Sequence, residues 1–242
     1  MPMTIVRPSE QQYNAAFDTE SAVKYQVIDS LEKDYGYAID IDKMLNAARV
    51  LACPVKVNPP NWQHGRVIYS ATRRFLSMKN SQIPVTLLDI GTAKGFSALC
   101  LRWALTDSCR KGSVTSVDVI DPNSRVMRNT IADVSGPKTL HEVLEPWPEA
   151  KSIRFVCSTG VSWLNETQGR IHFAFVDGKH NFASVSMEAQ LLSRRQDQGD
   201  IVIFDDLQIP GVAEAVRKTK SYEMRIVSLL HSNRQYAICT RK

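Results

Sequence analysis

The spacing of apolar residues changes near residue 80 of the chain. Over the first 80 residues, apolar positions recur three or four apart, which is the spacing of a helix face. Gly36 suits the end of a first helix, and Asp18 or Thr19 its start. Three helices are predicted from this spacing, over residues 18–36, 40–53 and 64–80, with a linker at 55–63. We therefore expect residues 1–80 to form a helical extension of a domain at 81–242.

Beyond residue 85, short apolar runs alternate with segments of helical spacing. The central runs are continuously apolar, as expected for parallel strands covered by helices on both faces. Strands are predicted over residues 85–91, 113–120, 153–157, 171–178, 200–206, 222–230 and 234–241. Helices are predicted between them, over residues 95–105, 123–134, 161–166, 182–195 and 211–220. The alternation indicates a doubly wound α/β domain, which binds ligands at the carboxyl ends of its strands.

One connection is longer than this alternation needs. Residues 135–152 include three prolines and Trp147. Long connections in compact domains often serve as lids or binding loops. A surface loop with one helical turn explains the same residues equally well, so both interpretations stay open.

Composition narrows the class of protein. With 43% hydrophobic and 23% charged residues, the chain is typical of a globular protein. No apolar run approaches the length of about 20 residues that spans a bilayer, and the first residues lack a signal-peptide pattern. The five cysteines are scattered without a CxxC pair, and several of them sit inside apolar runs, which fits reduced, buried thiols at those positions. We therefore expect a cytoplasmic protein without a membrane partner.

The net charge of +5 raises the question of a nucleic-acid partner. The basic residues are dispersed, and the densest groups are Arg73-Arg74 and Arg194-Arg195. Neither forms a basic stripe with interleaved aromatic residues. A solvated surface is therefore favoured over a nucleic-acid footprint, although an anionic substrate would also suit this charge.

A glycine-containing turn follows the first predicted strand, in the sequence LLDIGTAKGFS. Gly91 and Gly95 let the backbone turn sharply and approach a ligand, and the following helix offers unpaired N–H groups at its start. Asp89 ends this strand, and Asp118 ends the next one. A carboxylate at the second position can accept hydrogen bonds from both hydroxyls of a ribose. The turn therefore predicts a nucleoside-binding site.

The same turn distinguishes between two nucleoside cofactors. The dinucleotide fingerprint needs a glycine two residues after Gly91, where this chain has Ala93. A carboxylate at Asp89 would repel a pyrophosphate, whereas it could bind the positively charged amino group of a methionine. The charge argument therefore favours S-adenosylmethionine over a nicotinamide cofactor.

Four segments resemble motifs of the class I S-adenosylmethionine-dependent methyltransferases. LLDIGTAKG resembles their motif I, and SVTSVDVID resembles their ribose-binding strand. RFVCSTGVSWL is similar to their third strand, after which residues line the adenine. DIVIFDDLQIPGVAEAV is similar to a segment of the metal-dependent O-methyltransferases, of the macrocin and catechol types. The resemblance covers about residues 66–240.

This resemblance implies a Rossmann-like, mostly parallel sheet of seven strands in the order 3-2-1-4-5-7-6. It also implies S-adenosylmethionine as the cofactor. The residues that would bind it are Asp89, Gly91, Thr92, Ala93, Gly95, Phe96, Ser97, Asp118, Val119, Ser158, Thr159 and Asp177. Two places depart from the family pattern. Ser158-Thr159 replaces the usual Gly-Asp, and Gln198-Gly199-Asp200 replaces a glycine pair.

Three carboxylates are predicted to meet at the rim of the sheet. Asp177 ends the fourth strand, and Asp205 and Asp206 end the fifth. Adjacent strands lie about 4.8 Å apart, so these side chains should converge and repel one another. A divalent cation would relieve the repulsion, and all-oxygen ligands suit Mg²⁺. We therefore predict Asp177, Asp205 and Asp206 as ligands of Mg²⁺.

His180 follows Asp177 by three residues and can face the same cation. Its ordinary pKa of about 6.5 suits a general base. The cation would lower the pKa of a bound hydroxyl and position it for attack on the methyl sulfonium. In the enzymes that this chain resembles, the general base stands three residues after the metal-binding Asp. It is a lysine in the catechol-type enzymes and a histidine in the macrocin-type enzymes. Lys179 remains a rival base or an anion contact.

The sequence therefore predicts an O-methyltransferase that modifies a hydroxyl of a small molecule, of the sugar or natural-product type. Three alternatives remain: a metal-independent methyltransferase for nitrogen or another acceptor, a non-catalytic S-adenosylmethionine-binding module, and a nicotinamide oxidoreductase. Base N-methylation is disfavoured, because no Asn/Asp-Pro-Pro-aromatic loop follows the fourth strand. The N-terminal helices could also pair two copies of the chain in a homo-oligomer.

Overall fold

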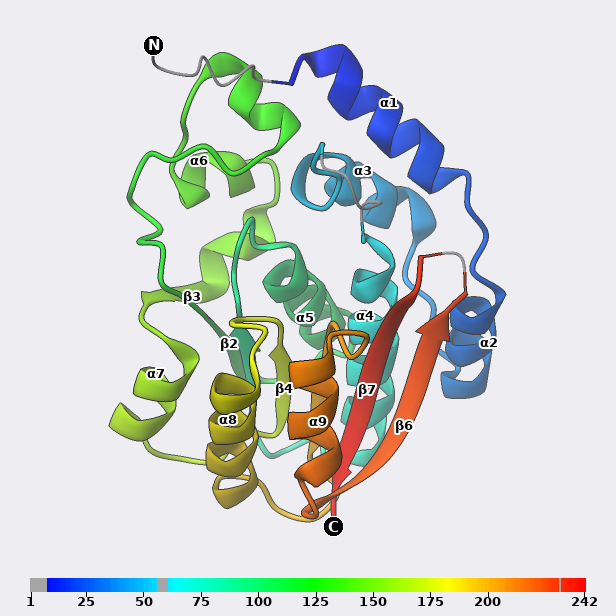
Figure 1. Cartoon of the computed structure of the whole chain (residues 1–242). Helices are drawn as coiled ribbons and strands as arrows, with labels where there is room; N and C mark the ends of the chain where they lie inside the picture. Colours follow the sequence, from blue (N-terminus) through cyan, green and yellow to red (C-terminus); the bar gives the residue numbers. More distant parts are fainter. Residues whose placement is uncertain (1–7, 56–60, 231) are drawn as a thin grey trace.

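A computed structural model describes residues 8–55, 61–230 and 232–242. In this part of the chain, seven strands form one sheet in the order β3-β2-β1-β4-β5-β7-β6 (Figure 1). Their bounds are β1 Val85–Ile90, β2 Gly112–Asp118, β3 Ile153–Cys157, β4 Phe173–Val176, β5 Ile201–Phe204, β6 Tyr222–Leu229 and β7 Arg234–Arg241. Strands β1 to β5 pair in parallel, and β7 pairs antiparallel with both β5 and β6. The predicted fold class and strand order are confirmed.

Helices cover both faces of the sheet. In the view of Figure 1, α8 and α9 lie in front of the strands, and α4 and α5 lie behind them. The helices are α1 Glu10–Ser21, α2 Gln26–Tyr35, α3 Ile41–Leu51, α4 Gln63–Met78, α5 Phe96–Asp107, α6 Leu140–Leu144, α7 Gly160–Glu166, α8 Phe182–Arg194 and α9 Pro210–Lys218. Two 3-10 helices, Ile131–Ser135 and Pro148–Ser152, lie in the connection before β3.

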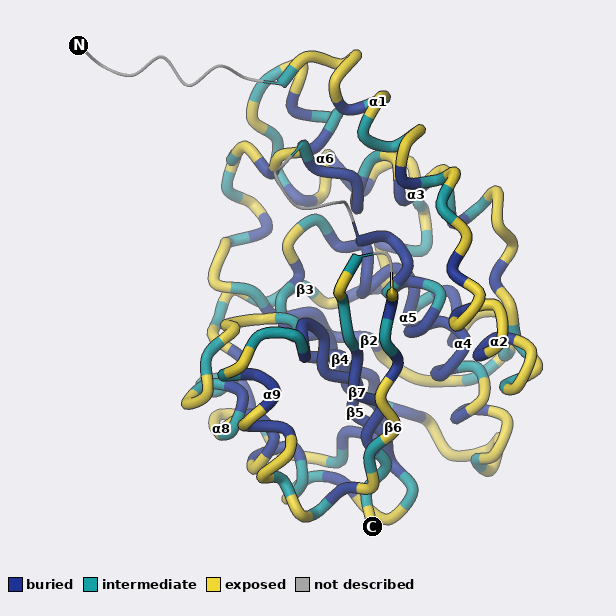
Figure 2. Tube along the Cα trace, turned by 45° about the vertical axis from the view of Figure 1, so that its right-hand side comes forward, coloured by how far each residue is buried: buried dark blue, intermediate teal, exposed yellow. Residues whose placement is uncertain are grey.

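The continuous apolar runs in the strands supply two separate cores. Phe173 and Phe175 pack with α4 and α5, while Ala174 and Val176 on the same strand pack with α8 and α9. Successive residues of a strand point to opposite faces, so a strand buried on both faces needs an unbroken apolar run. Figure 2 shows the consequence, with buried strands at the centre and exposed positions on the outer helices.

The helix predicted over residues 18–36 is wrong as a single element. The structure ends α1 at Ser21 and starts α2 at Gln26. The break leaves Tyr25 buried, with its hydroxyl donating to Glu20 at 2.7 Å. Neither Asp18 nor Thr19 caps a helix start, because α1 begins earlier with a capping box at Ser9. The predicted end is confirmed, since Gly36 closes α2 with a φ of +78°.

The helix predicted over residues 123–134 is also wrong. Val126 instead forms an isolated bridge with Lys138, and only the 3-10 helix at Ile131–Ser135 is helical. The Asp133 carboxylate accepts hydrogen bonds from the backbone N–H groups of Arg128 (2.8 Å) and Thr130 (3.0 Å). Short polar side chains that bind the nearby backbone in this way compete with helix formation. Asn129 has a φ of +53°, which a continuing helix does not allow.

The long connection over residues 135–152 carries α6 and packs inward. Leu140, Val143 and Leu144 are all buried, so this segment contributes to the core. The predicted linker at 55–63 falls partly on residues 56–60, outside the described residues. The boundary predicted at residue 80 stays a prediction. None of the helices in the described ranges is long and apolar enough to cross a membrane.

Candidate functional site

The turn after β1 lies against the end of β4. Gly91 has a φ of +101°, and its N–H donates to the Val117 carbonyl at 2.9 Å. Gly95 starts α5 with a φ of +84°, where its Cα faces Leu144. The Asp177 N–H donates to the Ile90 carbonyl at 2.8 Å, so the ends of β1 and β4 are joined directly. The carboxyl ends of the parallel strands therefore form one rim.

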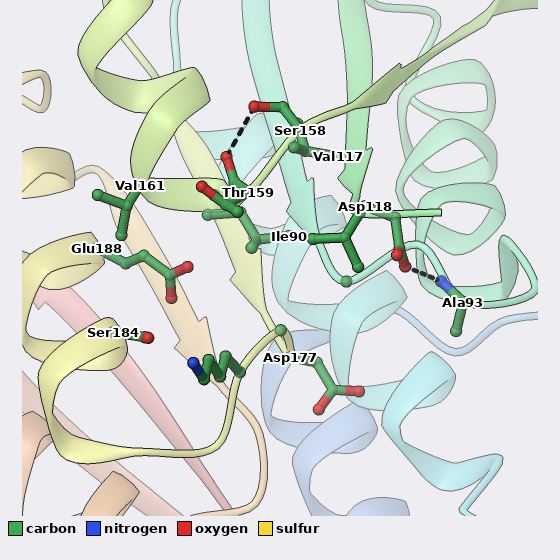
Figure 3. Close-up of a pocket in the computed structure, with 15 residues that line it drawn as sticks. Ile90, Ala93, Val117, Asp118, Ser158, Thr159, Val161, Asp177, Ser184 and Glu188 are labelled. Atoms are coloured by element: carbon green, nitrogen blue, oxygen red, sulfur yellow. Dashed lines mark hydrogen bonds between the residues drawn. The ribbon is translucent and has the colours of Figure 1, made fainter. Parts of the chain in front are cut away.

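A cavity of about 530 Å³ opens at this rim and is bounded on one side by α8 (Figure 3). We call it the first cavity. Asp118 and Thr159 point into it from the ends of β2 and β3, and Glu188 faces them from α8. The structure brings together in its wall the predicted cofactor residues Gly91, Ala93, Asp118, Val119, Ser158, Thr159 and Asp177.

A second cavity, of about 300 Å³, adjoins the first and shares Gly91, Ala93, Asp177 and Gly178 with it. Its wall also contains the predicted residues Thr92, Phe96, Ser97, His180 and Asp206. The predicted residues Asp89, Gly95 and Asp205 line neither cavity. Another part of the wall of the second cavity comes from residues at or just after the end of α3 and at or just before the start of α4. These are Leu51, Ala52, Pro54, Asn61 and His64. Residues of the N-terminal helical segment therefore line this cavity together with the rim of the sheet.

Asp118 is held firmly at the wall of the first cavity. Its Oδ2 accepts from the backbone N–H of Ala93 at 2.8 Å (dashed in Figure 3), and its Oδ1 accepts from Ile120 at 3.0 Å. Ala93 reaches this position with a φ of +46°. Each carboxylate oxygen keeps a further lone pair for a ligand. The geometry suits the predicted binding of two ribose hydroxyls.

Asp89 lies below the turn and is fully buried, away from the walls of both cavities. Its Oδ2 accepts from the Ser116 hydroxyl at 2.5 Å, and Ser116 in turn lies 2.6 Å from the Thr92 hydroxyl. Burial raises the pKa of Asp89 to about 7. The predicted contact with a methionine amino group therefore has no direct path, and Asp89 instead supports the turn from beneath.

Asp177, His180 and Asp206 form one cluster at the second cavity. His180 Nε2 lies 3.1 Å from Asp177 Oδ1, and His180 Nδ1 lies 3.2 Å from Asp206 Oδ2. The hydrogen bond to Asp177 raises the pKa of His180 to about 9, so the imidazole carries a proton at neutral pH. Arg234 of β7 also contacts Asp206, with Nη1 to Oδ1 at 2.8 Å.

Asp205 takes a different direction from Asp206. Its Oδ2 accepts from Asn61 Nδ2 at 3.3 Å, and its Oδ1 accepts from the Asp206 N–H at 2.6 Å. Burial and the neighbouring carboxylates raise the pKa of Asp205 well above its ordinary value. Asp206 has a left-handed φ of +54°, and its carboxylate faces His180. Of the three predicted metal ligands, Asp177 and Asp206 therefore lie together beside His180. Asp205 points away from them, toward Asn61.

The two candidate bases lie on different sides of the rim. Lys179 lines the first cavity, whereas His180 lines the second. Both side chains are exposed. Because Asp177 belongs to both cavities, His180 is the candidate base that shares a cavity with Asp206.

The cluster can accommodate a divalent cation. One ligand atom each from Asp177, His180 and Asp206 lies within 4.8 Å of the others. The set contains an imidazole, and so differs from the all-oxygen set predicted for Mg²⁺. Arg234 and a protonated His180 also balance the two carboxylates. A cation therefore fits the donors, but charge balance alone does not require it.

The residues at these cavities that sequence reasoning missed include Asn61, His64, Glu188 and Arg234. His64 stacks on Phe175 with ring centroids 5.7 Å apart. None of the four lies in a recognisable motif, and Arg234 follows Asp206 by 28 positions. Only the pairing of β5 with β7 brings Arg234 to the rim, so no local signal could have identified it.

Comparison with known proteins agrees with this architecture. A family model described as a methyltransferase domain matches residues 88–207. The O-methyltransferase from Bacillus cereus in complex with SAH is 13% identical, with a TM-score of 0.55 over 96% of this chain and 100% of that one. Cofactor-bound Rv0187 from MTB is 14% identical, with a TM-score of 0.54 over 98% and 99%.

An rRNA methylase from Streptococcus thermophilus is also similar, at 10% identity and a TM-score of 0.50 over 71% of this chain and 95% of that one. These identities show the fold alone. No curated protein matches the sequence. The family model and the seven-stranded fold nevertheless agree, and S-adenosylmethionine is the cofactor of that family. The chain therefore belongs to the class I S-adenosylmethionine-dependent methyltransferases, with the family's domain at residues 88–207.

Proposed function

We propose that this methyltransferase transfers the methyl group of S-adenosylmethionine to a hydroxyl group of a small molecule. The observation that carries the proposal is the position of the Asp177–His180–Asp206 cluster beside the boundary between the two cavities. One cavity has the features of a cofactor site, and the other presents acid–base groups. A hydroxyl in the second cavity would lie between the cofactor and His180.

The first cavity is the proposed adenosine site. Asp118 offers carboxylate oxygens to the ribose hydroxyls, and Ser158 and Thr159 line the space beyond it. The methionine part would follow the turn between Gly91 and Gly95 toward the second cavity. This placement brings the reactive methyl group to Asp177, which lines both cavities.

The second cavity is the proposed acceptor site. Its volume of about 300 Å³ suits a small molecule better than a macromolecular segment. Leu51, Asn61 and His64 belong to its wall, so residues 1–80 would act as a cap that shapes acceptor specificity. The relative in complex with SAH is described as an O-methyltransferase, which supports a hydroxyl acceptor here as well.

His180 is the proposed general base. Its hydrogen bond to Asp177 keeps the imidazole protonated at neutral pH, with a pKa of about 9. It can act as a base only after it has lost one of its two ring protons, and weakening the hydrogen bond to Asp177 would favour that loss. A divalent cation bound by Asp177 and Asp206 would engage the carboxylates instead and lower the pKa of a neighbouring hydroxyl. We therefore propose Mg²⁺ or a similar cation at this cluster, with Asp205 as a supporting residue behind it.

One observation favours a second candidate, which is methyl transfer without a cation. Arg234 lies 2.8 Å from Asp206 and already compensates that carboxylate. In this case His180 and Asp177 would act as a pair that orients the acceptor, and proximity to the methyl group would supply most of the rate. A neutral amine acceptor would suit this arrangement, because its lone pair can attack the methyl group before any proton is removed.

The two candidates are separated by a transfer assay with isotopically labelled S-adenosylmethionine. Hydroxyl acceptors such as catechols and sugars are compared with amines of the same shape, in Mg²⁺, Mn²⁺ or EDTA. Transfer to hydroxyls that EDTA abolishes and Mg²⁺ restores is the expected result. Transfer to hydroxyls that is indifferent to EDTA would select the cation-free candidate. Transfer to amines alone would contradict the proposal of O-methylation.

A further inference from the structure

Glu188 on α8 presents a buried carboxyl group to the first cavity (Figure 3). The side chain is only 3% exposed, and Oε2 has no hydrogen-bond partner anywhere in the described ranges. Burial raises its pKa to about 7. A buried polar group that lacks a partner destabilises the fold. A carboxyl group that faces a cavity in this way is complementary to a ligand with a hydrogen-bond donor.

The position of Glu188 within the cavity indicates which part of a ligand it meets. A Cβ added to Gly160 would lie 2.4 Å from Glu188 Oε1, and a Cβ added to Gly178 would lie 3.9 Å from the same atom. Glu188 is therefore beside the loops that follow β3 and β4. It lines the first cavity but not the second, whereas Asp177 lines both. If the ribose lies at Asp118 and the methionine part extends toward Asp177, as proposed above, the space near Glu188 is left for the adenine ring.

The hydroxyl groups of Ser158 and Thr159, which follow β3 beside this space, are already engaged. The Thr159 hydroxyl caps α7, since it accepts from the Ser162 N–H at 3.0 Å and lies 2.8 Å from the Ser162 hydroxyl. The Ser158 hydroxyl donates to the Thr159 carbonyl at 3.2 Å (dashed in Figure 3). Neither hydroxyl is placed to read the base. Three of the described residues that line the first cavity carry a carboxyl group, namely Asp118, Asp177 and Glu188. Asp118 is assigned to the ribose and Asp177 to the methionine side, which leaves Glu188 for the base.

Adenine carries an exocyclic amino group that donates hydrogen bonds, next to a ring nitrogen that accepts one. A carboxylate accepts from the amino group, and a protonated carboxyl group can in addition donate to the ring nitrogen. A hydrogen bond to a charged group in a buried site contributes about 1.5–3 kcal/mol, which is about 10- to 100-fold in affinity. The neutral and the ionised forms of Glu188 are therefore both complementary to adenine.

We propose that Glu188 recognises the exocyclic amino group of the cofactor's adenine and sets the preference of this enzyme for an adenine base. The inference rests on the placement of adenosine in the first cavity under the proposed function. It concerns binding alone, so it is independent of the acceptor and of any cation. A failure of O-methyl transfer would leave this inference unaffected.

The test compares S-adenosylhomocysteine with its analogue that carries purine in place of adenine and so lacks only the amino group. Titration calorimetry on the full chain gives both dissociation constants. We expect the wild-type protein to bind the adenine compound about 10- to 100-fold more tightly. Equal affinity for the two compounds on the wild-type protein would overturn the proposal without any variant.

Two variants and a control assign the preference to Glu188. Glu188→Gln keeps a carbonyl that accepts from the amino group and should retain a preference for adenine. Glu188→Leu should reduce the preference to within about threefold, because it removes the acceptor. Glu166→Leu is the matched control on the exposed surface of α7 and should bind as the wild type does. A folded Glu188→Leu protein that keeps the full preference would overturn the proposal.

Discussion

A methyl group on Gly91 would lie 2.2 Å from the carbonyl oxygen of Asp177. No Cβ can occupy that position without separating the turn after β1 from the end of β4. The φ of +101° at Gly91 is a second reason for glycine, because side chains rarely tolerate this region. The contact places the cofactor turn directly against the residue proposed to face the acceptor. Because Gly91 has no side chain, the cofactor-binding turn can pack directly against Asp177 at the border of the acceptor cavity.

The Gly91→Ala variant should lose about 2 kcal/mol or more of its free energy of unfolding, from backbone strain and displacement of the turn. Its affinity for S-adenosylhomocysteine should fall at least about tenfold, because the turn and the rim no longer meet. Urea denaturation and calorimetry measure the two effects. Gly169→Ala is the matched control, since Gly169 has a φ of +96° but no atom within 4 Å of its added Cβ. Equal losses in both variants would show that the contact with Asp177 is unimportant.

His180→Ala should reduce the turnover number by roughly 100- to 10,000-fold, the range for loss of a general base. Its affinity for S-adenosylhomocysteine should remain near that of the wild type, because His180 lines the second cavity and not the first. Lys179→Ala should have the opposite pattern, with altered cofactor affinity and a preserved chemical step. Single-turnover kinetics combined with calorimetry distinguish the two residues. A larger loss of turnover from Lys179→Ala would make Lys179 the base.

Asp205 and Asp206 should respond differently to the same substitution. Asp206→Asn removes a carboxylate that faces His180 and Arg234, so turnover should fall by roughly 100-fold. Asp205→Asn replaces a buried carboxyl group that faces Asn61 rather than His180, so turnover should stay within about threefold. Initial rates over a Mg²⁺ titration provide the measurement. If Asp205→Asn alone raised the cation concentration needed for activity, Asp205 would be a direct ligand.

Glu188 should make the stability of the cofactor-free protein depend on pH. Burial raises its pKa from 4.5 to about 7, so the folded state binds this proton more tightly than the unfolded state does. The stabilisation from the protonated form is complete below pH 4.5 and is lost as the pH rises to about 7. Above this range, Glu188→Gln should exceed the wild type by up to about 3 kcal/mol, and the two should be similar at low pH.

Urea denaturation at pH 4.5 and pH 8 tests this dependence, with Glu166→Gln as the exposed control. Wild-type and Glu188→Gln proteins of equal stability at pH 8 would indicate that Glu188 is solvated or paired in solution. Because no cofactor is present, the result does not depend on what Glu188 binds.

Local patterns in the sequence were sufficient for much of the fold. The strand positions follow from apolar runs, and the helix end at Gly36 follows from capping preferences. These signals act over a few residues, so they can be read without the tertiary structure. The same approach was wrong over residues 123–134, where Asp133 binds the backbone of Arg128 and Thr130 and prevents a helix. Apolar spacing does not report such a side-chain contact.

The sequence by itself determined which residue types stand at the carboxyl ends of the strands, including Asp118, Asp177 and Asp206. Only the tertiary structure decided where each side chain points. It directs Asp89 beneath the turn and Asp205 toward Asn61, and the pairing of β7 with β5 brings Arg234 to Asp206. It also brings Glu188 of α8 to the cavity wall. Strand identity is encoded locally, whereas the partner of a buried charge depends on elements that the folded chain brings together from distant positions.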